Sequence, residues 1–194
     1  EEYSGIRLKN RQVNHKLMDV SMAGRKYFKL PELDSVSRRF QRGKLSADSR
    51  EEFLTIGAVC QKSAVKTSAK GGKYVTWTLT DLHMSSPTTV KLLLFDEAFA
   101  THGWGGLGVS ADIGSVFVVF SPKFLSGGSR SEFLLQVSTV PQLTLLGTAA
   151  DLGTCRAKKK DGTRCSVAIN TTGPPYCEFH IGAEYKRMRQ GRGE

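Results

Sequence analysis

The sequence predicts a mainly β protein in which a small barrel is flanked by an N-terminal arm and a small C-terminal module. Short β-branched and aromatic runs, separated by Gly, Ser and Pro, fill the middle of the chain between residues 53 and 146. The first 50 residues contain too few large apolar side chains to fold alone. Three of the chain's four cysteines lie near its C-terminus. We therefore expect an arm at 1–50 that packs on a barrel at 51–148, followed by a separate module at 149–194.

Charge is distributed unevenly along the chain. The 28 Lys and Arg outnumber the 18 Asp and Glu, for a net charge of +10. Residues 1–50 carry 12 basic and 6 acidic side chains and residues 151–194 carry 9 and 5, whereas the middle has 7 of each. Such an excess favours a polyanionic partner, although a solvated basic surface without a partner is also common. No window approaches the roughly 20 apolar residues of a membrane span, so no membrane contact is expected.

The arm is predicted to contain one short helix. The segment NHKLMDVSMAG (residues 14–24) offers a capping Asn, a terminal Gly, and the apolar residues Leu17, Met18 and Met22 on roughly one face. The other segments are predicted to be extended or irregular and to pack onto the barrel: residues 1–10, 26–33 and 36–45.

The barrel is predicted from five strands. A candidate helix, DEAFATHGW (residues 96–104), separates the third strand from the fourth. This order matches an OB-fold, a five-stranded barrel, although another small barrel or an open sandwich would give almost the same pattern. The strands are Phe53 to Cys60, Tyr74 to Thr80, Val90 to Phe95, Ser115 to Phe120 and Glu132 to Val137, and the apolar piece Leu143 to Gly147 follows them.

Two loops of this barrel gather positive charge. In an OB-fold the loop between strands one and two faces the loop between strands four and five across a ligand groove. A flexible, solvated loop rich in Lys, Ser and Gly is the alternative. The first loop, QKSAVKTSAKGGK, holds Lys62, Lys66, Lys70 and Lys73 and no acid, and the second, SPKFLSGGSRS, holds Lys123, Phe124 and Arg130.

Two aromatic residues on the second strand are expected to face opposite ways. Tyr74 and Trp77 differ by three positions, and side chains alternate between the two faces of a strand. One ring can then pack in the core while the other is free to stack on bases. We expect Tyr74, beside the lysine loop, to be the exposed one, although core packing is the commoner fate of a strand aromatic.

The C-terminal module carries a metal-binding pattern. Cys155, Cys165, Cys177 and His180 are spaced C-x9-C-x11-C-x2-H. Cys₃His is a standard ligand set for Zn²⁺, and four protein ligands leave no open position, so we expect one structural zinc. A disulfide among the cysteines is the alternative. Zinc-bound thiolates imply a reducing compartment, cytosol or nucleus. Cys60 ends an apolar run and is best explained as a small buried hydrophobe.

Basic residues surround the expected zinc site. Lys158, Lys159 and Lys160 follow the first ligand, in a loop that the metal would hold in place. A helix is expected to begin near the last two ligands, because apolar residues recur there at helical intervals. Those residues are Phe179, Ile181, Tyr185 and Met188.

Several segments resemble the internal domain of the minichromosome maintenance protein ten family of eukaryotic replication factors. The zinc motif ADLGTCRAKKKDGTRC with YCEFH carries the most specific likeness. EEYSGIRLKN and MAGRKYFKL resemble the start of that domain, and GKYVTWTLTDL and VKLLLF resemble its middle. Together these segments cover most of the chain, whereas residues 95–130 depart from the family pattern and are unusually rich in glycine.

The resemblance implies an OB-fold packed against a Cys₃His zinc finger and acting with it as a DNA-binding platform in the nucleus. It implies binding of single-stranded and double-stranded DNA, contacts with DNA polymerase alpha and the sliding clamp, and association of the whole protein with the replicative helicase ring. No clean clamp-binding peptide is present. By position in the motif, Lys158 and Lys159 match the family's finger lysines, Tyr74 matches the cleft aromatic, and either Lys62 or Lys66 matches the cleft lysine.

The leading hypothesis is therefore a non-catalytic, sequence-tolerant DNA-binding scaffold of the replisome. Lysines would neutralise phosphates and aromatic faces would stack on unpaired bases. The alternative is a protein-interaction module whose groove mainly binds polymerase or clamp peptides. An enzyme is not expected, because His15, His83 and His102 lack a carboxylate or nucleophile at motif spacing and GWGGLG lacks the lysine of a phosphate-binding loop.

Overall fold

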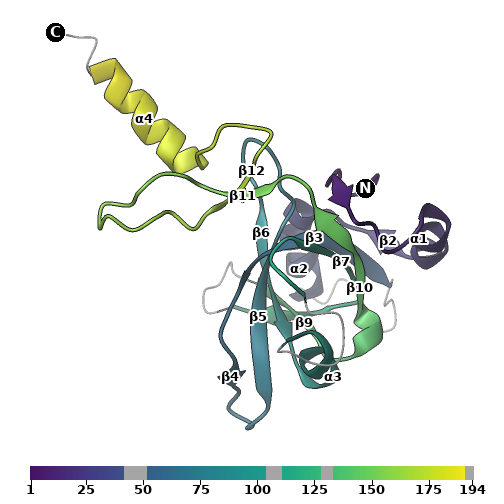
Figure 1. Ribbon diagram of the computed structural model, residues 1–194. Helices are drawn as coiled ribbons and strands as arrows, with labels where there is room; N and C mark the ends of the chain where they lie inside the picture. The colour runs from purple at the N-terminus through teal and green to yellow at the C-terminus, as the bar shows by residue number, and fades with distance from the viewer. Residues whose placement is uncertain (42–51, 104–110, 128–132, 191–194) are drawn as a thin grey trace.

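A computed structural model describes residues 1–41, 52–103, 111–127 and 133–190 (Figure 1). Figure 1 shows a barrel with the C-terminal module above it and helix α4 pointing away from both. Within the described residues, no helix is long and apolar enough to cross a bilayer. The elements are β1 (Leu8–Lys9), α1 (His15–Met22), β2 (Lys26–Tyr27), η1 (Leu30–Glu32), α2 (Leu33–Gln41), β3 (Phe53–Lys62), β4 (Lys66–Thr67), β5 (Lys73–Thr80), β6 (Thr89–Leu94), α3 (Asp96–Ala98), η2 (Phe99–Gly103), β7 (Ser115–Phe120), β8 (Lys123–Ser126), β9 (Phe133–Val137), η3 (Val140–Gln142), β10 (Leu143–Ala149), β11 (Leu152–Thr154), β12 (Ala168–Asn170) and α4 (Glu178–Gln190).

The barrel closes through a bend in its fourth strand. Strand β3 pairs with β5, β5 with β6, and β6 runs parallel to β9. On the other side β3 pairs with β7, and after a bend at Ser121 (φ +42°) the chain continues as β8, which pairs with β9. Strands β7 and β8 together therefore act as the fourth strand of a five-stranded ring. The predicted OB-fold order is present, and β10 is added outside it, against β7.

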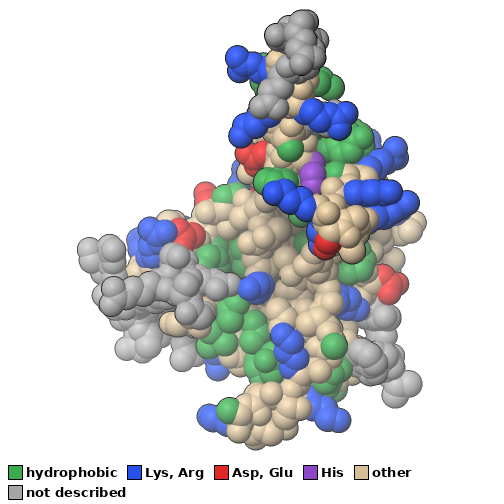
Figure 2. All heavy atoms as spheres, turned by 90° about the vertical axis from the view of Figure 1, so that its left-hand side faces the viewer, with side chains coloured by type: hydrophobic (Ala, Val, Ile, Leu, Met, Phe, Trp, Pro, Cys, Tyr) green, Lys and Arg blue, Asp and Glu red, His purple; other side chains and the backbone are tan. Residues whose placement is uncertain are grey.

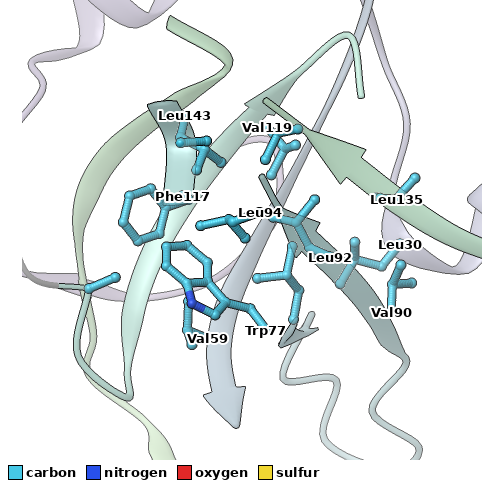
Figure 3. Close-up of a cluster of buried hydrophobic side chains, with 14 of the residues drawn as sticks. Leu30, Val59, Trp77, Val90, Leu92, Leu94, Phe117, Val119, Leu135 and Leu143 are labelled. Atoms are coloured by element: carbon cyan, nitrogen blue, oxygen red, sulfur yellow. The ribbon is translucent and has the colours of Figure 1, made fainter. Parts of the chain in front are cut away.

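The core of the barrel is organised around Trp77. Its side chain is fully buried, and its ring centroid lies 5.2 Å from that of Phe117 (Figure 3). Along β5 the burial alternates, with Val75, Trp77 and Leu79 facing inward. This alternation confirms that Tyr74 and Trp77 lie on opposite faces of the strand. It also leaves the outer face of β5 free to line a surface.

The arm packs against the barrel through its helix and its first residues. Ile6, Met18 and Met22 share a buried cluster with Leu54 and Ile56 of β3. The predicted helix is α1, and the Asn14 side chain caps it by accepting a hydrogen bond of 2.8 Å from the backbone N–H three residues later. Of the three apolar residues expected on roughly one face, Met18 and Met22 are buried, whereas the Leu17 side chain is 57% exposed.

A second helix in the arm was not predicted. Residues 36–45 were expected to be a strand or loop, yet α2 begins at Leu33 and extends through the first part of that segment. Leu33 and Val36 are buried, and Leu33 belongs to the barrel's core cluster, so tertiary packing stabilises a helix whose other residues are mostly polar. An ion pair of 2.5 Å between Asp34 and Arg38, one turn apart, adds a smaller contribution. Residues 42–51 lie outside the described part of the chain.

Two further segments differ from expectation in detail. The helical segment after β6 is confirmed as α3 followed by a π-helical turn, η2. The second basic loop is shorter than predicted, because its first half forms strand β8 and Phe124 stacks on Phe53 at 5.4 Å. Arg130 lies outside the described residues. The boundaries expected between arm, barrel and C-terminal module remain a prediction.

Candidate metal centre and nucleic-acid interface

The four predicted metal ligands come together. Their ligand atoms lie within 4.8 Å of one another, and the three cysteines are buried. The chain's four cysteines are all described and all are free, so the disulfide alternative does not hold. The His180 Nδ1 lies 3.1 Å from the Cys177 Sγ and 3.5 Å from the Cys155 Sγ. Tetrahedral Zn²⁺ with bonds of ~2.0–2.3 Å places neighbouring ligand atoms ~3.5 Å apart, so the cluster fits zinc.

Local structure holds these ligands in position. Cys155 follows β11 directly, while Cys177 precedes the first turn of α4. The backbone N–H of Cys177 points to the Cys155 sulfur at 3.3 Å, and the His180 N–H donates to the Cys177 carbonyl at 2.9 Å. The C-x2-H pair therefore sits on one helical turn, as its spacing predicts.

The three lysines after the first ligand lie in a tight hairpin. The backbones of Lys158 and Arg164 form an isolated antiparallel β-bridge, and the N–H of Lys159 donates to the Thr163 carbonyl at 2.8 Å. Asp161 accepts from both the N–H and the hydroxyl of Thr163, at 2.9 and 2.6 Å. Gly162 completes the turn at φ +81°. The segment thus has hydrogen-bonded order of its own, in addition to the ligands at either end.

A groove of about 400 Å³ lies on the outer face of the barrel sheet. Its floor is formed by the outward-facing side chains of β5 and β6, which alternate along each strand with the side chains that face the core. Tyr74, at one end of this floor, is half-buried and stacks on Phe95 with ring centroids 4.9 Å apart. The outward residues that line the groove include Gln61, Lys66, Tyr74, Thr76, Thr78, Lys91 and Leu93.

The structure separates Lys62 from Lys66. Lys62 lines the groove, but its register partner is Trp77, and its ammonium group donates to the Ala111 carbonyl and lies 5.8 Å from the Trp77 ring centroid. Lys66 pairs with Tyr74 across the short β4–β5 hairpin and is exposed. Lys66 is therefore the better placed of the two to meet a ligand stacked on Tyr74.

The remaining predicted lysines lie around the groove. Lys70 and Lys73 are exposed near the tip of the β4–β5 hairpin, beyond the groove lining. Lys123 pairs with Gln136, which pairs in turn with Leu93. Because directly paired residues share a face of the sheet, Lys123 lies on the groove side, two strands from Leu93.

Lys91 and Gln61 are among the groove residues that sequence reasoning missed. Lys91 could have been found from the alternation of its strand, since its neighbours Val90 and Leu92 are apolar. Gln61 had no signal, because its importance lies in a contact with a distant segment. Its amide donates to the Ser166 carbonyl, next to the Cys165 ligand, at 3.3 Å.

The groove and the lysine hairpin share one face of the molecule. Figure 2 shows Lys and Arg side chains from the C-terminal module at the top down to the tip of the β4–β5 hairpin, with few acidic side chains between them. Lys66, Lys158, Lys159 and Lys160 are all exposed. The groove therefore combines lysines, neutral polar side chains and an aromatic ring, and further positive charge lies beside it on the finger, an arrangement suited to a nucleic-acid strand.

Comparisons with known proteins agree with this architecture. The family model for the MCM10 OB-fold matches residues 2–144, and the primase zinc-finger model matches residues 147–192. These matches confirm the OB-fold, and the finger match together with the four-ligand group confirms one structural zinc as cofactor.

Curated relatives match along nearly the whole chain. The MCM10 homolog of Drosophila melanogaster is 34% identical over 95% of this chain and 22% of its own length. The homolog of Mus musculus is 30% identical over 99% and 20%, and that of Homo sapiens is 29% identical over 100% and 21%. The chain thus spans about a fifth of the length of these relatives. Among solved structures, a Plasmodium falciparum SSB complex with ssDNA aligns over 49% of this chain and 91% of its own, at 15% identity and a TM-score of 0.32, too weak a likeness to carry any argument.

Proposed function

This chain belongs to the MCM10 family, and on that premise we propose that it is a non-catalytic DNA-binding scaffold of the eukaryotic replisome, acting in the nucleus. Single-stranded DNA would lie across the barrel groove and continue over the lysine hairpin of the zinc finger, and duplex DNA would bind the same basic surface. In the full-length protein, the module would help to recruit DNA polymerase alpha to the replicative helicase ring, with the sliding clamp as a further candidate partner.

The groove offers both components of sequence-tolerant binding. The Tyr74 ring, backed by Phe95, presents a flat surface for an unpaired base, and such stacking contributes about 1–3 kcal/mol per base. Lys66 pairs with Tyr74 in the β4–β5 register, so its ammonium group can reach the phosphate next to a stacked base. Thr76 and Thr78 add neutral hydroxyl groups on the groove floor.

The finger would supply a second cationic surface. Zinc, when bound, fixes the positions of its four ligands and so replaces a hydrophobic core that so short a segment could not build. The hairpin between Cys155 and Cys165 holds Lys158, Lys159 and Lys160 exposed on a hydrogen-bonded backbone. These lysines can neutralise phosphates without first ordering their loop, which lowers the entropic cost of binding.

One observation carries the proposal: the Gln61 amide joins the groove to the finger through the Ser166 carbonyl, on the face that carries the lysines. This contact supports the proposal that a single strand follows both surfaces.

Metal removal tests this mechanism directly. Affinity for a fluorescent oligonucleotide of about 25 nucleotides, longer than the ~4–16 covered by one OB-fold, would be measured by anisotropy before and after chelation. We expect one equivalent of zinc, and an affinity that is reduced but not abolished when it is removed, because the groove remains. An unchanged affinity would exclude the finger from DNA binding, and complete loss would exclude the groove.

A peptide is the second candidate ligand for the groove. Leu93 and Leu134 are half-buried apolar residues in its lining, and they could accept side chains of an extended polymerase or clamp segment. Titrating a polymerase alpha peptide against the labelled oligonucleotide separates the two possibilities. Mutual displacement would indicate one shared groove, and additive binding would indicate separate sites.

A further inference from the structure

An ion pair joins the N-terminal arm to the connection that leads into the zinc finger, next to Leu152 of β11, which packs against the buried cluster that contains Ile6. The Arg7 guanidinium donates two hydrogen bonds to the Asp151 carboxylate, 2.8 Å from Nε and 2.5 Å from the second nitrogen. Asp151 lies in the short connection between the last barrel strand, β10, and the first finger strand, β11. Two parallel bonds of this kind fix an angle as well as a distance.

Backbone contacts place Arg7 firmly on the barrel. Leu8 pairs with Ala149 in the β1–β10 ladder, and the Ala150 N–H donates to the Arg7 carbonyl at 2.8 Å. Ile6, the preceding residue, is buried in the cluster that also contains Leu146. The arm is therefore part of the barrel's rigid body at the point where the guanidinium extends toward the finger.

Asp151 in turn holds the finger. Its backbone carbonyl accepts hydrogen bonds from the N–H and the hydroxyl of Thr171, at 2.8 and 3.2 Å, just after β12. Its side chain is 12% exposed, and the hydrogen bond from Arg7 holds the pKa of the carboxyl below its usual value, so the pair is charged at neutral pH. One residue thus binds the arm through its side chain and the finger through its backbone.

Among the described residues, two single side-chain hydrogen bonds also join the finger to the barrel, and Leu152 of β11 packs against the cluster that contains Leu146. Gln61 donates to Ser166 at 3.3 Å, and Asn170 donates to the Leu82 carbonyl at 2.9 Å. Each can act as a pivot, whereas the Arg7–Asp151 pair opposes rotation about the connection. Loss of the pair would therefore leave the finger attached through Leu152 and these two hydrogen bonds, with a weaker constraint on its orientation.

We propose that Arg7 and Asp151 are positioning residues that hold the zinc finger in register with the barrel groove. The arm would then fix the orientation of the connection between the two DNA-binding surfaces. This inference rests on the proposed function only for its effect on DNA, since the orientation of the finger can be measured without any ligand.

The test compares Arg7→Gln and Asp151→Asn with Lys9→Gln as a matched control. Lys9 is exposed two residues away on the same arm, so its replacement removes one positive charge without touching the joint. Residual dipolar couplings would be recorded separately for barrel and finger in the zinc-loaded protein. One alignment tensor is expected to fit both parts in the parent and in Lys9→Gln, and two different tensors are expected in Arg7→Gln and Asp151→Asn. A single tensor in both joint variants would overturn the proposal.

DNA binding provides the second measurement. Affinity for an oligonucleotide of about 25 nucleotides is expected to fall about tenfold in the two joint variants, because an unfixed finger lowers the effective concentration of the second surface. Affinity for one of about 6 nucleotides, confined to the groove, is expected to stay within about twofold of the parent. Different tensors for barrel and finger, together with an unchanged affinity for the long oligonucleotide, would support the positioning role of Arg7 and Asp151 and refute two-surface DNA binding. Zinc content and barrel chemical shifts show whether each variant is folded.

Discussion

Replacing Lys158 and Lys159 together with glutamine should weaken single-stranded DNA binding by a predictable amount. Six exposed lysines line the groove or lie in the finger hairpin: Lys62, Lys66, Lys91, Lys158, Lys159 and Lys160. If about six phosphates are neutralised, the slope of log affinity against log salt should be near −4, at roughly −0.7 per phosphate. Removing two contacts should change that slope to about −2.8 and weaken binding about tenfold at ~0.15 M salt.

The salt series makes this prediction quantitative. Between about 50 and 200 mM salt the parent should lose roughly 300-fold in affinity and the double variant only roughly 50-fold. Anisotropy titrations at four or more salt concentrations would determine both slopes. Because the lysines contact backbone rather than bases, the loss should be similar for oligonucleotides of different sequence.

The matched control removes the same charge from another part of the molecule. Lys9 and Lys16 are exposed on the arm, and Figure 1 shows α1 on the side opposite the β4–β5 hairpin. Lys9→Gln with Lys16→Gln should leave the slope near −4, with a small change in affinity from the lower net charge. Equal slopes in the parent and the Lys158/Lys159 variant would refute direct phosphate contact by the hairpin, and a loss confined to one sequence would indicate base readout instead.

Other expectations concern single side chains. Trp77→Ala should lower the free energy of unfolding by about 3–5 kcal/mol in urea denaturation, because the ring is fully buried; a loss below 1 kcal/mol would contradict its central place in the core. Tyr74→Ala should instead weaken DNA binding by about 1–3 kcal/mol, and Tyr74→Phe should preserve it, since the ring face and not the hydroxyl is used; equal losses in both would disprove stacking. Gly162→Ala should destabilise the hairpin by about 1 kcal/mol or more, since the turn requires φ +81°, and amide exchange there should accelerate. Cys60, predicted to be buried, is half-buried, and this burial raises the pKa of its thiol to about 11, so at pH 8 only about one molecule in a thousand carries the thiolate; mass spectrometry should show slow alkylation of Cys60 in the metal-loaded protein, and fast reaction there would contradict its partial burial.

The sequence was most informative where local pattern and structure coincide. The ligand spacing predicted a zinc site because Cys177 and His180 needed only one helical turn to meet the other two ligands. Alternation along β5 assigned Trp77 to the core and Tyr74 to the surface for the same reason: both inferences depend on neighbours in the chain. The family likeness was carried by these same segments.

The sequence was least informative where contacts between distant segments determine the structure. Helix α2 was missed although its apolar residues Leu33, Val36 and Phe40 recur at helical spacing, because most of its other residues are polar. Gln61 matters through Ser166, which is 105 residues away, and Arg7 through Asp151, which is 144 residues away. Such contacts leave no periodicity. The choice between Lys62 and Lys66 likewise required the register that places Lys62 beside Trp77.

The stacked pair of Tyr74 and Phe95 has a kinetic consequence. A tyrosine supported on one side by another ring has little rotational freedom left to lose, so a base arriving on its open side meets a stationary plane. Phe95 would thereby lengthen the residence time of a strand that it never contacts. Trimming Phe95 to alanine would leave every direct ligand contact intact and still hasten dissociation, which stopped-flow measurements would register as a faster off-rate at a nearly constant on-rate.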